Sequence, residues 1–306
     1  MPAEPLAVLA SDLHFSHVPP AARSAEPSWY EAQGRYIGQM KKLAEGYDVP
    51  IIVAGDIFDR WKPVSSPPEL VNFLLDTLPT IYAVPGQHDL PDHSYPERHR
   101  SPYGTLVRAG KINDLLPDAP RSIGRLIVHG FPWGHSLRPW EHSPPDGYVT
   151  RLAVVHAYIW TAGHTYPDAP ADQAAEHYKP KLAGYDAAVF GDNHKGFMLG
   201  RRLINCGTFL KRKSDEKSYR PMIGVLWHDT GTVWIEPHYL DTSGDRWIEE
   251  SSAESVELTA LDASGLLASL REAGLDSLDF RSELNREMDA RNVSQGVRSM
   301  ILDAVP

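Results

Sequence analysis

The sequence is short of several features, and each shortage excludes a class of protein. A single cysteine, Cys206, among 306 residues excludes an internal disulfide framework and fits a reducing compartment. No run approaches the ~20 apolar residues that a membrane-spanning helix requires. Residues 1–15 lack a basic segment ahead of their apolar residues, so they do not follow the pattern of a signal peptide. We therefore expect a cytoplasmic protein with no membrane partner.

Basic residues are also in the minority. The chain holds 30 Lys and Arg against 40 Asp and Glu, a formal net charge of −10. This balance argues against broad electrostatic wrapping of nucleic acid. It does not exclude a nucleic-acid enzyme, because metal ions in an acidic site add local positive charge that a residue count omits.

Five short apolar runs, each followed by a polar cluster, predict buried strands. They span residues 6–10, 51–54, 81–84, 152–155 and 187–190. Helical patterns lie between them, the clearest over residues 29–45 and 69–78. Alternating strands and helices predict an α/β layered body, and such sheets place ligands at the carboxyl ends of their strands.

The last part of the chain divides into a hairpin and a helical region. Segments 222–227 and 232–240 predict a β-hairpin that closes a second sheet. We expect a catalytic domain over residues 1–247. Residues 248–306 show no strand pattern and predict a small C-terminal region of three short helices. Two roles stay open for that region, packing on the body and docking another chain.

Side chains that bind metals follow all five predicted strands. They are Asp12, His14, Asp56, Gln87, His88, His156, Asp192 and His194. Asp12 and His14 are one residue apart, and alternate residues of an extended strand end point the same way, so both can meet one metal. Asp192 and His194 have the same spacing. Any one pair arises often by chance, but five strand ends that all carry such residues predict a dinuclear centre.

Three of these residues suit particular roles. Asp56 follows Gly55, which allows a tight turn, and its two carboxylate oxygens can bridge two cations. The amide oxygen of Gln87 suits a hard cation, and His88 can hold a proton near neutral pH.

The order of the motifs resembles the calcineurin-like metallophosphoesterases. It runs D-x-H, GDIFDR, GQHD, a lone His after a strand, and G-x-x-H. Within that superfamily, LAGYDAAVFGDNHKG followed by INCGTFLKRKSDE is similar to the DNA repair nucleases of the SbcD type. The resemblance covers roughly residues 6–240. It implies a layered sandwich of two mixed β-sheets flanked by helices.

The resemblance also implies two divalent metal ions bridged by Asp56, and a catalytic role for His88 in the departure of the leaving oxygen. One metal would be bound by Asp12, His14, Asp56 and His194, and the other by Asp56, Gln87, His156 and Asp192.

Three positions depart from the family pattern. Gln87 replaces the usual Asn and Asp192 the usual His, and both substitutes keep atoms that bind metal. The second metal then has oxygen-rich ligands, so we expect Mn²⁺, with Mg²⁺ as the second choice. Asp59 stands where the nuclease branch often has a histidine that positions DNA, which weakens the transfer of exonuclease activity.

Basic residues near the motifs are candidates for binding substrate. Arg60 can steady Asp56, meet a substrate phosphate or pair with Asp59. Lys195 begins a basic cluster around the last ligand loop, which can be a solvated face or a guide for a nucleic-acid backbone. The cluster comprises Lys195, Arg201, Arg202, Lys211, Arg212 and Lys213.

Together these residues predict a two-metal phosphoesterase that hydrolyses phosphodiester bonds, and the resemblance implies a DNA repair nuclease of the SbcD type. The expected partners are DNA and either an SMC-like ATPase subunit of the SbcC type or a second copy of the chain. Two alternatives stay open. One is a small-molecule phosphoesterase that cleaves cyclic nucleotides or a nucleotide-sugar pyrophosphate, and the other is a catalytically silent metal-binding subunit.

Overall fold

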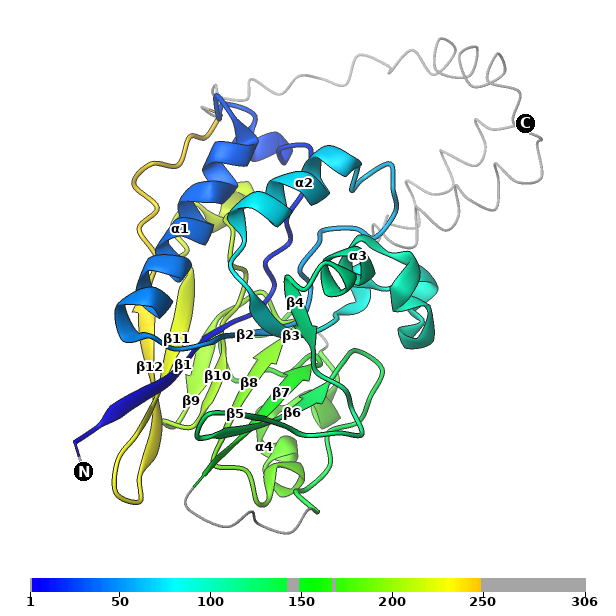
Figure 1. Ribbon diagram of the computed structural model, residues 1–306. Coiled ribbons are helices and arrows are strands. Elements are labelled where there is room, and N and C mark those ends of the chain that lie inside the picture. Colours follow the sequence, from blue (N-terminus) through cyan, green and yellow to red (C-terminus); the bar gives the residue numbers. More distant parts are fainter. Residues whose placement is uncertain (1, 142–148, 167–168, 249–306) are drawn as a thin grey trace. The chain divides into compact units, whose positions relative to one another are not determined.

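Two mixed β-sheets pack face to face with helices on their outer sides (Figure 1). The computed structural model describes residues 2–141, 149–166 and 169–248. The predicted C-terminal helices therefore lie outside the described residues. The described part confirms the predicted α/β sandwich.

The first sheet has the strand order β12-β11-β1-β2-β3-β4. Its strands are β1 (Glu4–Ala10), β2 (Ile51–Ala54), β3 (Ile81–Val84), β4 (Ile112–Asp114), β11 (Met222–His228) and β12 (Val233–Tyr239). The second sheet has the order β5-β6-β7-β8-β10-β9. Its strands are β5 (Arg121–Ile123), β6 (Leu126–Phe131), β7 (Thr150–His156), β8 (Ala187–Gly191), β9 (Phe197–Leu199) and β10 (Leu203–Asn205).

Most helices lie on the outer face of the first sheet. The α-helices are α1 (Trp29–Tyr47), α2 (Pro68–Thr77), α3 (Pro102–Arg108) and α4 (Ala175–Tyr178). Short 3₁₀ helices are η1 (Ala21–Arg23), η2 (Gln87–Asp89), η3 (Pro91–His93), η4 (Tyr95–Arg100), η5 (Ala171–Gln173), η6 (Pro180–Leu182) and η7 (Ser214–Glu216). Helix α1 begins where the Ser28 side chain accepts a hydrogen bond from the Glu31 N–H, and it ends at Asp48, whose φ of 53° stops the helix. No helix among the described residues is long and apolar enough to cross a bilayer.

Alternation along the central strands builds three apolar layers. On β1, Val8 faces the helices while Leu9 faces the other sheet. On β7, Val154 faces the first sheet and Val155 faces α4. Strands buried on both faces need no polar alternation, which is why they read as continuous apolar runs. Both sheets therefore hold their strand ends in fixed positions.

The C-terminal hairpin forms as expected but joins a different sheet. Strand β11 pairs antiparallel with β1, with Leu9 opposite Gly224, and β12 pairs with β11. The hairpin thus extends the first sheet, and the expectation that it closes a second sheet is wrong. A local pattern identifies a hairpin, but the strand that pairs with β11 is decided by packing between segments more than 200 residues apart.

Candidate metal centre

The predicted ligand residues lie at or just beyond the carboxyl ends of five strands. The first sheet supplies the segments after β1, β2 and β3, and the second sheet supplies the last residue of β7 and the segment after β8. Carboxyl ends of parallel strands share one edge of a sheet, and the two sheets bring these edges together. His156 of the second sheet joins them directly, because its Nδ1 lies 2.7 Å from the carbonyl oxygen of Ala54 on β2.

A first group of metal-type side chains contains Asp12, His14 and His194. Their ligand atoms lie within 4.8 Å of one another. The Nε2 atoms of His14 and His194 face each other at 2.9 Å. Asp12 and His14 are fully buried, so these side chains form the floor of the site.

A second group lies around Asp56 and His156. Asp56 Oδ2 is 3.5 Å from His156 Nε2 and 3.6 Å from His14 Nε2, which places this carboxylate between the two groups. Gln87 extends the second group, because its Oε1 lies 2.7 Å from His156 Nε2 and its Nε2 donates to Asp192 Oδ1 at 2.7 Å. All seven predicted ligands therefore converge on one place.

The loops that carry the ligands have unusual backbone. Asp12, His14, Asp56 and Asp192 have φ values of 50°, 46°, 50° and 91°. The expectation that Asp12 and His14 alternate along an extended strand end is therefore wrong, and so is the same expectation for Asp192. β-Carbons make this region costly, so non-glycine residues occupy it only where the surroundings enforce it. Here the His14 N–H donates to the Asp56 carbonyl at 2.9 Å and the Asp12 carbonyl accepts from the Phe209 N–H at 3.1 Å.

Two glycines permit the close approach of these loops. A β-carbon on Gly86 would lie 2.1 Å from Asp56 Oδ1. One on Gly55, which has a φ of 86°, would lie 2.1 Å from His156 Nδ1. Such distances are far below van der Waals contact, so any side chain at either position would displace a candidate ligand.

The donor set fits a divalent cation. Asp12 Oδ2 and Asp56 Oδ2 are buried without a hydrogen-bond partner. Burying a polar oxygen without a partner is costly unless it is paired or coordinates a metal. Two imidazole nitrogens in contact at 2.9 Å likewise need a proton or a cation between them. Carboxylate, imidazole and amide donors together suit first-row divalent metals.

The lowered pKa values of the imidazoles favour metal binding in the first group. Burial, followed by the positive charge of Arg212, lowers the pKa of His194 to about 3. The same two causes lower the pKa of His14 well below its usual value. Both rings are therefore neutral at neutral pH, which is the form that binds metal.

In the second group, His156 and Asp56 stabilise each other's charged forms. Burial opposes protonation of His156, but the negative charge of Asp56 outweighs burial and raises the pKa of His156 to about 10. Burial alone would raise the pKa of Asp56, whereas the charges and hydrogen bonds of His156 and His88 lower it. A metal bound between Asp56 and His156 must therefore displace a proton.

His88 borders the centre, and one of its ring nitrogens lies within 4.8 Å of ligand atoms of His14 and Asp56. Its N–H donates to Asp56 Oδ1 at 2.9 Å, and its Nδ1 lies 2.6 Å from the carbonyl oxygen of Asp59. That carbonyl accepts only if Nδ1 carries the proton, so Nε2 is the free nitrogen of the neutral ring. The side chain is 41% exposed, with Nε2 4.0 Å from Asp56 Oδ2. This position suits proton transfer to a group bound above the centre.

Asp89 is a structural residue of the site that motif reasoning missed. Its fully buried carboxylate accepts hydrogen bonds from the backbone N–H groups of Ile57, Phe58 and Gly86 at 2.9–3.1 Å. Asp89 thereby ties the loop of Asp56 to the loop of His88. The signal was present in GQHD, where an acidic residue follows the expected ligand and catalytic residue.

Two asparagines hold the last ligand loop. The amide of Asn193 donates to the carbonyl oxygens of Ile159 and His164, at 2.7 and 2.8 Å. The amide of Asn205 donates to the carbonyl oxygens of Asn193 and Lys195, at 2.6 and 3.1 Å. Neither asparagine was singled out from the sequence, since a buried structural amide has no local pattern.

The basic residues differ in how they face the centre. Lys195 Nζ donates to the Thr165 carbonyl at 2.6 Å, which engages its amine away from the ligands. The side chain of Arg60 is 60% exposed, with Nε 4.0 Å from Asp59 Oδ2. Arg212 instead forms an ion pair with Asp59, and only 13% of its side chain is exposed. The hydrogen-bonded ion pair with Asp59 therefore distinguishes Arg212 from Lys195 and Arg60.

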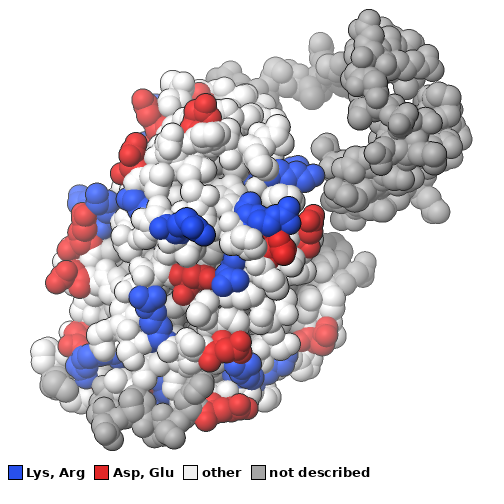
Figure 2. Space-filling model, turned by 45° about the vertical axis from the view of Figure 1, so that its right-hand side comes forward, with Lys and Arg blue, Asp and Glu red and all other residues white. Residues whose placement is uncertain are grey.

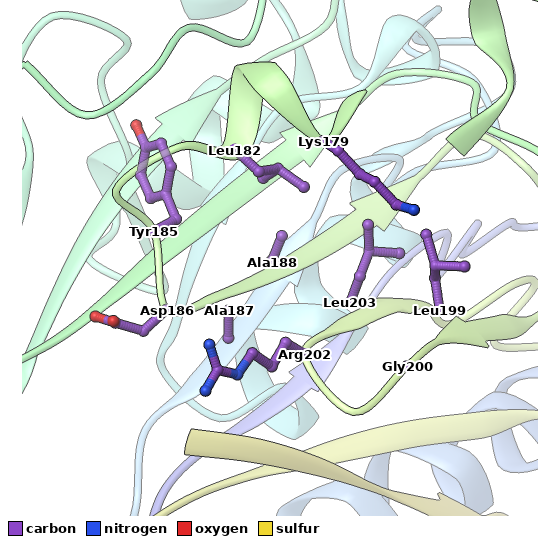
Figure 3. Close-up of a pocket in the computed structure, with 10 residues that line it drawn as sticks. All are labelled: Lys179, Leu182, Tyr185, Asp186, Ala187, Ala188, Leu199, Gly200, Arg202 and Leu203. Atoms are coloured by element: carbon purple, nitrogen blue, oxygen red, sulfur yellow. The ribbon is translucent and has the colours of Figure 1, made fainter. Parts of the chain in front are cut away.

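A hollow of about 550 Å³ lies apart from the centre (Figure 3). Its floor includes Leu182, Ala188 and Leu203, and Lys179 and Arg202 line its sides. Residues at the start of β8 line it, whereas the ligands follow the end of that strand. None of its ten labelled residues belongs to the candidate centre.

Comparisons with solved structures show low similarity. A 5′-nucleotidase precursor from Thermus thermophilus is 12% identical, with 78% of this chain and 54% of that chain covered and a TM-score of 0.44. A 5′-nucleotidase from Candida albicans is 12% identical, with 79% and 53% covered and a TM-score of 0.39. Vps29 complexed with Zn²⁺ from Entamoeba histolytica is 11% identical, with 77% and 99% covered and a TM-score of 0.29. The chain thus spans about half the length of the nucleotidases, and we transfer no activity from any of these proteins.

No curated protein matches the sequence significantly. A family model, that of the calcineurin-like phosphoesterases, matches residues 7–196. The matched range contains every residue of the candidate centre, from Asp12 to His194. Because the model covers more than half of the sequence, the chain belongs to the calcineurin-like phosphoesterase family.

Proposed function

We propose that this chain is a two-metal phosphodiesterase that hydrolyses DNA, in the manner of the SbcD-type nucleases. The observation that carries the proposal is the position of Asp56. Its Oδ2 lies within 3.6 Å of an imidazole nitrogen of each ligand group, as a carboxylate shared by two cations requires. When bound, two such cations polarise the phosphoryl group, supply a hydroxide and stabilise the leaving oxygen.

The residues of the chain would divide the remaining tasks. Asp12, His14 and His194 hold one side of the centre, and Gln87, His156 and Asp192 hold the other. In its doubly protonated form, His88 would deliver the proton on Nε2 to the leaving oxygen and keep the proton on Nδ1, through which the Asp59 carbonyl orients the ring. Asp89 keeps the loops of Asp56 and His88 together during this transfer.

The charge on the surface bears on how DNA would be bound. Figure 2 shows Lys and Arg interspersed with Asp and Glu on the face that it draws. With a net charge of −10, attraction to a phosphate backbone has to come mainly from the loaded centre and the basic residues near it. Affinity for DNA should consequently depend on the divalent metal.

The test compares Mn²⁺-dependent turnover of linear duplex DNA, single-stranded DNA, bis-p-nitrophenyl phosphate and a phosphate monoester. Preference for DNA or the diester supports the proposal. Exclusive turnover of the monoester contradicts it and favours a small-molecule phosphoesterase. Loss of all turnover with both metals bound favours the silent subunit.

A further inference from the structure

An ion pair between Arg212 and Asp59 borders the candidate centre. Asp59 follows β2, and Arg212 lies on the loop between β10 and η7. The guanidinium of Arg212 contacts Asp59 Oδ1. The same oxygen lies 3.7 Å from His14 Nδ1. The pair therefore lies directly beside one of the expected metal ligands.

The backbone of Arg212 is held from both sides. Its N–H donates to Glu216 Oε2 at 2.6 Å. The carbonyl oxygen of the preceding residue, Lys211, accepts from Arg23 Nη1 at 2.6 Å, and both Lys211 and Arg23 are buried. A loop fixed in this way presents the guanidinium in a constant place, which lowers the entropic cost of binding an anion.

The guanidinium has hydrogen-bond donors to spare. A guanidinium carries five N–H donors, and one nitrogen of Arg212 contacts Asp59. Its Nε is buried without a partner. Arginine binds phosphate oxygens through such paired donors, so this side chain is equipped to receive a phosphate oxygen beside the centre.

The negative charge of Asp59 affects phosphate monoesters and phosphate diesters differently. A diester phosphate carries one negative charge, whereas a monoester carries close to two above its second pKa of about 6. The second charge would lie near the Asp59 carboxylate in a partly buried place, where like charges repel strongly. Arg212 attracts both phosphates, and Asp59 opposes the more highly charged one.

We propose that the Asp59–Arg212 pair selects the substrate class, with Arg212 binding a non-bridging phosphate oxygen and Asp59 disfavouring dianionic monoesters relative to monoanionic diesters. This inference rests on the proposed phosphodiesterase function, because it assumes that a phosphate binds at the centre. It assigns to Asp59 a role through charge, separate from the hydrogen bond between its carbonyl oxygen and His88.

The test measures two ratios in the Mn²⁺-loaded protein at about pH 8, where a monoester is dianionic. The first is kcat/KM for p-nitrophenyl phosphate over that for bis-p-nitrophenyl phosphate. The second is the calorimetric dissociation constant of inorganic phosphate over that of dimethyl phosphate. Asp59→Asn should raise the first ratio about tenfold and lower the second about tenfold, since the variant removes one negative charge near the bound phosphate.

Arg212→Gln should act differently, because it removes attraction for both phosphates. It should weaken binding of both anions by about tenfold or more, as loss of a charge-assisted hydrogen bond does. Arg212→Lys should recover part of the affinity. Bound Mn²⁺ and the unfolding temperature are measured for every variant, so that loss of metal or of folding is recognised.

The matched controls are Glu4→Gln and Arg125→Gln. Glu4 and Arg125 form another Arg–carboxylate pair, at the start of β1. The centre follows the end of that strand, about 20 Å away at ~3.3 Å per residue, well beyond the Debye length of about 8 Å. These variants should leave both ratios unchanged.

The outcomes separate the inference from the proposed function. If Asp59→Asn is folded and metal-loaded but leaves both ratios unchanged, the selection role is wrong, although diester turnover by the wild type would still support the phosphodiesterase. If the wild type turns over neither ester, the phosphodiesterase proposal fails and the binding ratio decides the inference alone. A wild-type protein that binds neither anion overturns the inference as well.

Discussion

At the residue scale, the side chains of the centre make different contacts and so contribute differently to the proposed reaction. Asp56 Oδ2 lies within 3.6 Å of an imidazole nitrogen of each ligand group, and the Asp12 carboxylate also lies near both groups. His88 touches Asp56 and keeps a free ring nitrogen. The Asp192 carboxylate accepts a hydrogen bond from Gln87, and its backbone N–H donates to Asp12 Oδ1 at 2.9 Å. These differences lead to three predictions.

Asp56→Asn should abolish turnover and lower the bound Mn²⁺ from two ions, because the substitution removes the negative charge shared by both sites. Turnover of bis-p-nitrophenyl phosphate and metal content by atomic emission check this. Asp215→Asn, an exposed change of the same chemistry on η7, is the control and should keep both quantities. Near-normal turnover with two metals in Asp56→Asn would show that Asp56 does not bridge them.

His88→Ala should cut turnover by about 10²–10⁴-fold while both metals stay bound, the usual contribution of general acid–base assistance. The reason is that its Nε2 is free and its Nδ1 is held by the Asp59 carbonyl. Kinetics and metal content are measured on the same preparation. Loss of one metal in this variant would instead make His88 a ligand.

Asp192→His should shift the second site from Mn²⁺ toward Zn²⁺. Asp192 and Gln87 offer oxygen atoms, which suit Mn²⁺ and Mg²⁺, whereas imidazole also suits later transition metals. We expect Mn²⁺ to be the best activator of the wild type, Mg²⁺ weaker and Zn²⁺ poor. Titration of each metal into both proteins checks this, and identical selectivity would remove Asp192 from the ligand set.

At the scale of elements, a buried ionic network attaches η1 and α1 to the chain that follows β12. Arg23 donates to Glu26 Oε1 at 2.5 Å and pairs with Asp245 Oδ1 at 2.8 Å. The N–H of Arg246 donates to Glu26 Oε1 at 2.8 Å, and the ring of Trp247 stacks 4.9 Å from the Arg23 guanidinium carbon. Arg23 is also the residue that holds the Lys211 carbonyl, so the network reaches the loop of Arg212.

Breaking this network should destabilise the fold in a pH-dependent way. Burial would raise the pKa of Glu26, but the hydrogen bonds from Arg23 and Arg246 outweigh it and lower that pKa below 4.5. A carboxyl group whose pKa is lower in the folded than in the unfolded protein stabilises the fold at pH values above its unfolded pKa. This stabilisation is lost as the pH falls through 4.5 toward the pKa of the folded protein. Glu26→Gln should therefore have a lower free energy of unfolding than the wild type at neutral pH, and this difference should shrink in acid.

The measurement is urea unfolding of both proteins from about pH 7 down to about pH 3. Removing one partner of a buried ion pair costs about 3–5 kcal/mol, which sets the expected loss at neutral pH. Glu97→Gln is the control, since Glu97 pairs with Arg100 on the exposed side of η4. A difference in unfolding free energy that stays constant with pH would show that the charge of Glu26 does not contribute to stability.

At the scale of the whole molecule, the described body ends at Ile248, whose N–H donates to the Ala22 carbonyl at 3.2 Å. Truncation after Ile248 should therefore leave a folded body that binds metal, because both sheets and the ionic network precede the cut. If the C-terminal region docks an ATPase subunit or a second copy, the truncated chain should also show altered association. Circular dichroism and light scattering measure the two effects, and an insoluble body would mean that residues 249–306 complete the core.

Much of the fold and of the site was predictable from local patterns. Residues 51–54 and 81–84 are strands as expected, since short buried runs flanked by polar clusters have few other structures. The metal-type residues follow those strands because open α/β sheets expose their strand ends. The family motifs join residues as distant as Asp12 and His194 into one site.

By itself, the sequence determined the five strands that precede the ligand residues, the C-terminal hairpin and the family to which the chain belongs, whereas β4, β5, β6, β9 and β10 were not predicted. Only the tertiary structure decided that β11 pairs with β1, that four ligands adopt left-handed backbone, and that Asp89 joins two loops. It also decided that Arg212, not Lys195, turns its charge toward the centre. The physical reason is the range of the interactions. Periodicity and turn chemistry act over a few residues, whereas these contacts join segments up to 200 residues apart whose meeting depends on the packing of two complete sheets.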